Sequence, residues 1–474
     1  MPTKQTLFFF TFACFLLFGC SSESTTQKLL IEHARLIDGT GGSPLEDVSI
    51  LISNGRIERI EQQMIVAPEA TKLDASGLTV LPGLIDAHVH ISSVPGAGFR
   101  GDSLQAIREL QRFHLRAYLA CGVTTILDTA IPVDEAREIQ SWLAAGHPGP
   151  RLLVLSPTFS TPDGYISDEA LSPRLFFPPV ASPQDVEERF RESEGLDAVG
   201  VKVLMESGFG VGRMPIHAPE VRQGIRESAA KRNLPLYIHS TTEADQQLAL
   251  DMGAHALVHG GTVGSDELLA RLKEQPAYMI TTLSIQDAWT IAFDPARLDE
   301  PLYQSMVPPV ELQTARLPEA WQNLAFRFAK AALTESATEE EIANFLQAGN
   351  PAAALVAWVQ NIKKLHAAGL PIVMGSDSGN WPIMPQMFHG PTSLREIELL
   401  GMAGLSPMEA IQAATSVPAT MLDLSDEIGT VEIGKQADLV IVKDDPLDDL
   451  SALRTIRWTV KGGVAKSPKE WLEE

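Results

Sequence analysis

The stretch Gly83-Leu84-Ile85-Asp86-Ala87-His88-Val89-His90 is a short apolar run that ends in two histidines. Side chains at alternate positions of a β-strand face the same way, so His88 and His90 can direct two imidazoles towards one metal ion. Hydrogen-bonded core or surface histidines can have the same spacing, and the pair alone leaves both interpretations open. The stretch therefore predicts a strand with metal-competent side chains near its C-terminal end.

Further short runs rich in Val and Ile follow, and each is separated from the next by a stretch whose sequence is typical of a helix. This alternation is typical of βα units whose parallel sheet is buried on both faces. Eight such strands predict an α/β fold, a (β/α)8 TIM barrel, with its chemistry at the C-terminal strand ends. The predicted strands are Leu84–His90, Val123–Ala130, Leu152–Ser160, Ala198–Met205, Leu236–Ser240, Ala256–Gly260, Tyr278–Ser284 and Ile372–Ser378.

The two ends of the chain have a different pattern, with alternating strands and tight turns. Asn54-Gly55 between two such strands is a strong hairpin signal. We expect residues 29–81 and 427–465 to build one small β-sandwich domain, and residues 82–426 to form the barrel. An insertion at about 285–370 is expected to cover the active-site face, which is where such barrels vary.

Four more barrel strands end in residues that suit a metal site: Lys202, His239, His259 and Asp377. Lys202 stands in an apolar run, where an unpaired ammonium would cost several kcal/mol. It must then pair with a carboxylate, reach solvent from the strand end, be neutral, or be modified. A lysine carboxylated by CO2 can bridge two divalent ions through its carbamate oxygens. Five segments with such residues at one barrel face predict a metal centre.

On these residues the chain resembles the amidohydrolase superfamily, in its binuclear branch with a carboxylated lysine. It is most similar to imidazolonepropionase-like and Xaa-Pro dipeptidase-like members. The resemblance covers about residues 29–465 and also rests on Gly122-Val123-Thr124-Thr125, Val201-Lys202-Val203, Gly375-Ser376-Asp377 and the tail Gly429–Val440.

The resemblance implies a set of site roles. His88, His90 and Asp377 would hold the more buried of two divalent ions, expected to be zinc, and His239 and His259 the more exposed one, with carboxylated Lys202 as the bridge. Ions roughly 3.5–4 Å apart can share a water and lower its pKa towards about 7. Asp377 would then take the proton of the attacking hydroxide and return it to the departing amine.

Substrate contacts are less defined. The loop after the third strand carries Tyr165, but it lacks the Gly-Gly-His-Gly run that is usual in the dipeptidase-like relatives. Tyr165 is a candidate replacement for that histidine, Arg213 a candidate clamp for a substrate carboxylate, and His389 a candidate pocket residue. An ordinary loop tyrosine, a solvated arginine, and a capping or packing histidine are the respective alternatives.

The N-terminus has the features of an export signal. Lys4 precedes the apolar run 7–19, which is too short to span a bilayer and ends at Cys20. Leu17-Phe18-Gly19-Cys20 resembles a bacterial lipobox. We therefore expect a signal peptide at 1–19, a lipid on Cys20, a tether at 20–28, and a place on the periplasmic face of the outer membrane. Simple secretion is the alternative.

Composition narrows the function classes. The chain has 474 residues and a formal net charge of −23, which makes a nucleic-acid partner improbable because such binding draws on clustered Lys and Arg. The expected activity is hydrolysis of an amide in a small peptide or N-acyl amino acid. A lactone or cyclic amide hydrolase is the alternative within enzymes, and a non-catalytic envelope binding lipoprotein the alternative outside them. The oligomeric state stays open, a homo-oligomer included.

Overall fold

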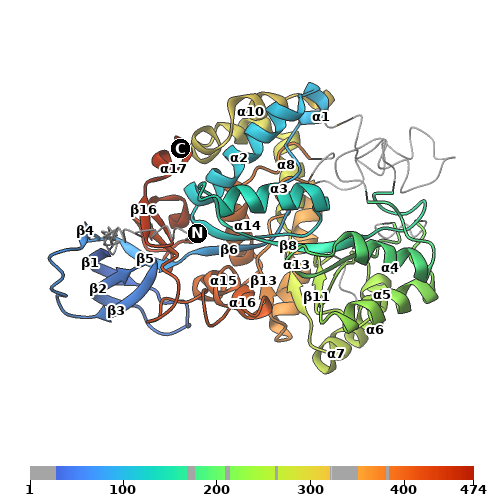
Figure 1. Cartoon of the computed structure of the whole chain (residues 1–474), viewed down its shortest axis with the longest axis horizontal. Coiled ribbons are helices and arrows are strands. Elements are labelled where there is room, and N and C mark those ends of the chain that lie inside the picture. The colour runs from blue at the N-terminus through green and yellow to red at the C-terminus, as the bar shows by residue number, and fades with distance from the viewer. Residues whose placement is uncertain are drawn as a thin grey trace, which may run out of the picture.

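The computed structural model describes residues 28–167, 177–208, 214–261, 265–320, 322, 351–380 and 384–474. The predicted signal peptide and residues 20–27 of the predicted tether lie outside this part of the chain, while Lys28 already begins the first strand. Figure 1 shows the small β-sheet at one end of the molecule and the barrel with its surrounding helices at the other.

All eight predicted barrel strands are present and pair in parallel in chain order, which confirms the predicted (β/α)8 fold. The strands are β6 (Leu84–Val89), β7 (Val123–Asp128), β8 (Arg151–Phe159), β9 (Ala198–Leu204), β10 (Leu236–His239), β11 (Ala256–Val258), β12 (Tyr278–Ile280) and β13 (Ile372–Val373). Most of their residues are buried, as expected of a sheet covered on both faces.

The last and first strands meet at a seam that closes the barrel. Ala87 N donates to Met374 O at 3.0 Å, Asp377 N to His88 O at 2.8 Å, and His90 N to Ser378 O at 2.9 Å. All three bonds lie beyond the C-terminal end of β13, and two of them involve His88, His90 or Asp377. The closing contacts are therefore made by the backbone of three residues expected to hold metal.

Helices and short turns surround the strands (Figure 1). The α-helices are α1 (Ala97–Arg100), α2 (Leu104–Ala120), α3 (Val133–Ala144), α4 (Pro183–Glu192), α5 (Pro219–Lys231), α6 (Glu243–Asp251), α7 (Asp266–Glu274), α8 (Ser284–Phe293), α9 (Pro301–Met306), α10 (Pro309–Ala315), α13 (Pro351–Ala367), α14 (Pro391–Met402), α15 (Pro407–Ala413), α16 (Ser416–Met421) and α17 (Pro468–Leu472). The 3-10 helices are η1 (Pro295–Asp299), η2 (Pro318–Ala320) and η3 (Leu450–Arg454). Several begin at a Ser or Thr that caps the helix through its side chain, as at Ser103, Thr242 and Ser265.

Both chain ends build the second sheet, as predicted. Its strands are β1 (Lys28–Leu36), β2 (Leu45–Ser53), β3 (Arg56–Glu61), β4 (Thr71–Asp74), β5 (Thr79–Pro82), β14 (Leu439–Val442), β15 (Ile456–Lys461) and β16 (Val464–Lys466). They form one continuous sheet with a shared apolar core that contains Ile50, Val80 and Ile441. Asn54 and Gly55 both have positive φ angles and turn β2 into β3.

The start of the predicted insertion packs against the turn that carries Asp377. Ser284, the first residue of α8, donates through Oγ to the carbonyl of Ser376 at 2.6 Å. Glu396 of α14 accepts from the backbone of Leu283 and Ser284 at 3.0 and 2.7 Å. Residues 321 and 323–350 of the insertion lie outside the described part, so its role as a cover stays a prediction.

Asp287 of α8 is a buried carboxylate held by two guanidinium groups. Arg395 and Arg297 each approach both of its oxygens, at 2.9 to 3.1 Å. Burial acts to raise the pKa of Asp287, but the hydrogen bonds and charges of the two arginines outweigh it and leave the pKa below its usual value. The network ties α8, η1 and α14 together.

Replacement of Asp287 by asparagine is expected to destabilise the fold by about 3 kcal/mol at neutral pH, because two partly buried cations lose their anion. A carboxylate with a depressed folded pKa stabilises the fold above its unfolded pKa of about 3.9, and this contribution is lost as pH falls through the folded pKa. The difference in unfolding free energy between wild type and variant should therefore be constant from pH 7 to about 5 and shrink below about pH 4.

Urea unfolding of both proteins at each pH measures this difference. Asp134→Asn, at a fully exposed carboxylate, serves as the control. A difference that grew on acidification would contradict the assignment.

No helix within the described ranges is both long and apolar enough to cross a membrane.

Candidate active site

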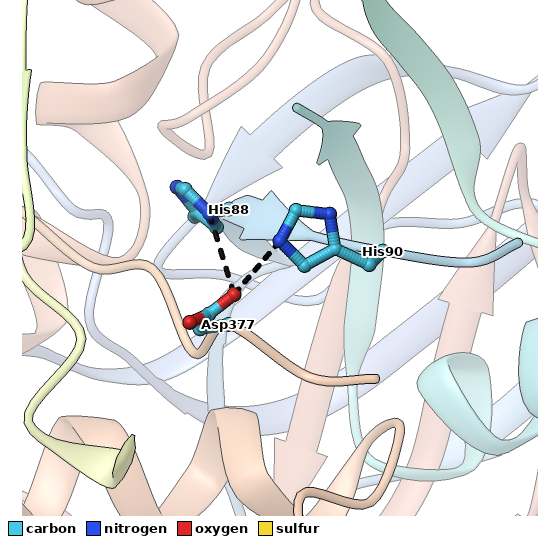
Figure 2. A group of neighbouring side chains, drawn as sticks. All are labelled: His88, His90 and Asp377. Atoms are coloured by element: carbon cyan, nitrogen blue, oxygen red, sulfur yellow. Dashed lines mark ion pairs between the residues drawn. The ribbon is translucent and has the colours of Figure 1, made fainter. Parts of the chain in front are cut away.

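The C-terminal end of β6 and the turn after β13 bring His88, His90 and Asp377 together. Oδ1 of Asp377 lies 3.4 Å from Nε2 of His88 and 2.9 Å from Nε2 of His90. Figure 2 shows both imidazoles directed at this one carboxylate. One donor atom from each residue lies within 4.8 Å of the others, as a shared cation requires.

The local backbone explains the close approach. A Cβ at Gly375 would lie 2.7 Å from Cβ of His88 and 2.6 Å from Cγ2 of Ile280, so only glycine lets the strands come so near. Asp377 and His259 adopt positive φ angles of 54° and 76°, which are unusual for residues with a side chain. Such strain, on the order of 1 kcal/mol each, is typical of functional positions.

The ends of β9, β10 and β11 supply the other predicted ligands. The ring centroids of His239 and His259 are 4.4 Å apart, and those of His259 and His88 are 5.0 Å apart. Nδ1 of His259 contacts the hydroxyl of Thr282 at 2.9 Å. Lys202 is 2 % exposed and lines the same cavity. All six predicted metal-site residues are therefore brought to one face of the barrel.

The electrostatics of the cluster favour binding of a cation. Burial lowers the pKa of His88 to about 3, and burial and the nearby histidines hold the pKa of His259 well below its usual value, so both rings are neutral with a lone pair. Burial acts to raise the pKa of Asp377, but hydrogen bonds and charge from His88 and His90 hold it well below its usual range.

Lys202 has a perturbed pKa as well. Burial lowers the pKa of its amine to about 7, against the opposing influence of Asp377 and Asp128. A substantial neutral fraction is therefore present near neutral pH, and only the neutral amine reacts with CO2.

A divalent ion fits this set of donors. Among the buried atoms that lack a hydrogen-bond partner are Nδ1 of His88 and Nδ1 of His90. Buried polar atoms are rarely left in this state without a bound ion or water. Imidazoles combined with carboxylate oxygen suit zinc and similar divalent metals.

The cluster forms the floor of a small cavity of about 40 Å³. The phenol ring of Tyr165 lies against His239, with ring centroids 4.6 Å apart, which places this candidate substrate contact beside the metal residues. The cavity is lined by His88, His90, Ala130, Tyr165, Ile166, Phe177, Lys202, Leu204, His239, His259, Asp377 and Asn380. Apart from the six predicted metal-site residues, the lining is mainly apolar and aromatic.

The other two substrate candidates have different positions. Arg213 lies outside the described residues. His389 is buried, with Nδ1 2.9 Å from the hydroxyl of Tyr118 and Nε2 2.8 Å from the carbonyl of Ser93. Both ring nitrogens contact protein atoms and the ring is not part of the cavity lining, so its substrate contact stays a prediction.

Two polar residues at the site were not predicted. Asn380 donates to Oδ2 of Asp377 at 2.7 Å, and Glu206 contacts Nε2 of His239 at 3.1 Å. A signal for Glu206 was present, because a lone carboxylate directly follows the apolar strand of Lys202 at the end where ligands collect. Asn380 follows Asp377 by three residues in a turn, and no sequence pattern marks it.

Known proteins share both the sequence and the fold. Residues 79–465 match the amidohydrolase family. A dihydroorotase from Geobacter sulfurreducens is 31% identical over 144 residues, which are 30% of this chain and 32% of that protein. The chain thus spans about a quarter to a third of the length of the curated relatives it matches.

Solved structures resemble nearly the whole chain. A Xaa-Pro dipeptidase with bound methionine superposes with a TM-score of 0.72 at 22% identity, and it covers 93% of this chain and 100% of its own. Molinate hydrolase gives a TM-score of 0.69 at 20% identity, with 94% and 95% covered. At such identities the structures show the common fold. The sequence match is long enough to decide membership, and this chain belongs to the amidohydrolase family.

Proposed function

We propose that this protein is a metal-dependent hydrolase that cleaves the C–N bond of an amide in a small peptide or an N-acyl amino acid. The observation that carries the proposal is the convergence of six metal-competent side chains, from five strand ends, on one cavity. Family membership supports it independently. His88, His90 and Asp377 would hold one ion, His239 and His259 the second, and Lys202, carboxylated, would bridge them.

Two divalent ions, zinc in our proposal, would supply an activated water and polarise the scissile carbonyl. The chain's own contribution is to place and move protons. Asp377 lines the cavity, with Oδ2 accepting from Asn380, and would accept the proton of the attacking water and return it to the amine nitrogen. That return matters because an amide nitrogen leaves poorly unless it is protonated.

A lactone or cyclic amide is the second candidate substrate. The same arrangement would attack a carbonyl in a ring as well as one in an open chain. The cavity volume of about 40 Å³ favours a compact group at the reacting centre, which is the observation that keeps this candidate.

A substrate screen tests the proposal. The purified chain, loaded with zinc in the presence of bicarbonate, is assayed against dipeptides, N-acyl amino acids, lactones and cyclic amides. We expect turnover of open-chain amides that stops when a chelator removes the metal. Turnover of cyclic compounds alone would select the second candidate. No turnover in any class by the loaded protein would indicate a non-catalytic binding protein and refute the proposal.

We also propose that Cys20 carries a lipid and holds the enzyme at the periplasmic face of the bacterial outer membrane. The proposal rests on Lys4, the apolar run 7–19 and Leu17-Phe18-Gly19-Cys20. Labelled palmitate should enter the wild-type protein and leave Cys20→Ser unlabelled. Equal labelling of both proteins would rule the anchor out.

A further inference from the structure

A carboxylate without an assigned role, Glu206, lies directly beside His239. Its side chain is buried, 1 % exposed as a residue, just beyond the C-terminal end of β9. Oε2 lies 3.1 Å from Nε2 of His239 and accepts from Oγ1 of Thr241 at 2.5 Å, while Oε1 accepts from the backbone N of Gly208 at 2.7 Å. Both oxygens are therefore fixed by the protein.

The contacts of Glu206 are those of an acceptor. The backbone N–H of Gly208 donates to Oε1 and the Thr241 hydroxyl donates to Oε2. As an ionised carboxylate, Glu206 would accept from Nε2 of His239 in the same way. A neutral imidazole with a proton on Nε2 has its lone pair on Nδ1, which is the nitrogen left for a metal ion.

The ring of His239 is also fixed by packing. Tyr165 lies against it at a centroid distance of 4.6 Å and 32°, and His259 meets it edge-on at 4.4 Å and 66°. A partial rotation of the ring would break both ring contacts, and a 180° flip would break the Glu206 contact. The orientation of His239 is therefore set before any ion arrives.

The other three candidate ligand histidines have different partners. His88 and His90 face Asp377, which is itself a candidate ligand, and His259 contacts the hydroxyl of Thr282. Within the described ranges, His239 is the candidate ligand histidine that contacts a carboxylate, Glu206, which is not itself a candidate ligand.

We propose that Glu206 is the positioning residue of the second metal ion: it holds His239 in the tautomer that offers Nδ1 to the ion. Its negative charge also offsets cationic charge that Asp377 and a carbamate on Lys202 leave uncompensated in a buried site. The proposal rests on the proposed metal-dependent function. Carboxylates that orient metal-binding histidines typically change metal affinity by about 10- to 100-fold, and we expect an effect of this size.

The test is a metal-affinity measurement on Glu206→Gln. The amide keeps the shape of the side chain but removes the charge, and its NH2 group opposes either Nε2–H of His239 or the N–H of Gly208. In a competition titration with a zinc chelator, one of the two ions should bind about 10- to 100-fold more weakly than in wild type, and the other should be unchanged. Equal affinities for both ions in variant and wild type would overturn the proposal.

A matched control exists in the same chain. Glu311 is 1 % exposed, and its Oε1 lies 2.8 Å from Nε2 of His114, so it forms a second buried Glu–His pair away from the metal cavity. Burial raises the pKa of Glu311 well above its usual value, so Glu311→Gln replaces a buried acid beside a histidine with an amide of the same shape and should leave both zinc affinities unchanged. A similar loss in both variants would show a general effect of altering a buried Glu–His pair and refute the specific role of Glu206.

A second readout reports the tautomer itself. Imidazole 15N shifts of the metal-free, 15N-histidine-labelled protein should show His239 protonated on Nε2 in wild type and a shift towards Nδ1 in Glu206→Gln. If that variant does not fold, Thr241→Val removes a single donor to Glu206 and should weaken the same ion several-fold. An unchanged tautomer and unchanged affinity in the folded variant would overturn the proposal.

Failure of this inference can be told from failure of the proposed function. A wild-type chain that binds two ions and hydrolyses amides, with Glu206→Gln equal to it in affinity, keeps the function and loses the role of Glu206. A wild-type chain that binds no pair of ions loses both.

Discussion

Lys202→Ala is expected to abolish turnover, by at least about 10³-fold, and to reduce bound metal well below two ions per chain. Lys202 is buried and lines the same cavity as the four histidines, and the lowered pKa of its amine supplies the neutral form. In the proposed centre, addition of CO2 would form an N–C bond, release a proton and give a carbamate with oxygens for both ions. Alanine has no amine and cannot form the carbamate. Elemental analysis and kinetics on one preparation measure both effects.

Partial rescue distinguishes loss of the bridge from loss of the fold. Acetate or propionate, diffusing into the space left by Lys202→Ala, should restore some metal and some activity. Lys461→Ala is the matched control, because it removes a lysine that pairs with Asp438 at 2.7 Å in the small sheet. Normal metal content and activity in Lys202→Ala would exclude the bridged centre.

Asp377→Asn is expected to have the second large effect, a loss in kcat of about 10³-fold on amides. Proton transfer by a placed side chain contributes roughly 10² to 10⁴. An asparagine can neither take the proton of the attacking water nor return one to the amine. It also leaves His88 and His90 without their shared carboxylate, so weaker metal binding should accompany the loss.

The leaving group provides an internal control for this variant. An activated aryl ester departs without a proton, whereas an amide nitrogen does not. Measured at saturating metal, Asp377→Asn should lose more activity on the amide than on the ester. Equal losses on both substrates would mean that Asp377 does not protonate the leaving group.

The barrel could be predicted from the sequence because a parallel sheet buried on both faces leaves contiguous apolar runs. The same logic placed the site, since the C-terminal ends of all eight strands point to one face. Strand lengths were less predictable: the runs 278–284 and 372–378 contain only Tyr278–Ile280 and Ile372–Val373 as strand. Beyond those residues the backbone turns and presents site residues such as Asp377. The apolar sequence of the two runs does not show where the strand ends and the turn begins.

Contacts between distant segments could not be predicted from the sequence. The pairing of Glu206 with His239 depends on the register of β9 against β10, in which His239 lies opposite Leu204. The burial of His389 depends on Tyr118 from α2, far earlier in the chain. A pattern within one segment indicates what a residue can do, but its partner is decided by the fold.

The seam between β13 and β6 has a consequence for how the protein is made. Asp86 accepts from the backbone of Ser376 across 290 residues, and the His-His-Asp cluster lies at the same junction. A chain emerging from the ribosome carries both histidines long before their carboxylate, so the three-residue cluster cannot exist on a chain that ends before Asp377. Metal binding by the proposed three-residue cluster would therefore separate chains extended past residue 377 from chains stalled before it.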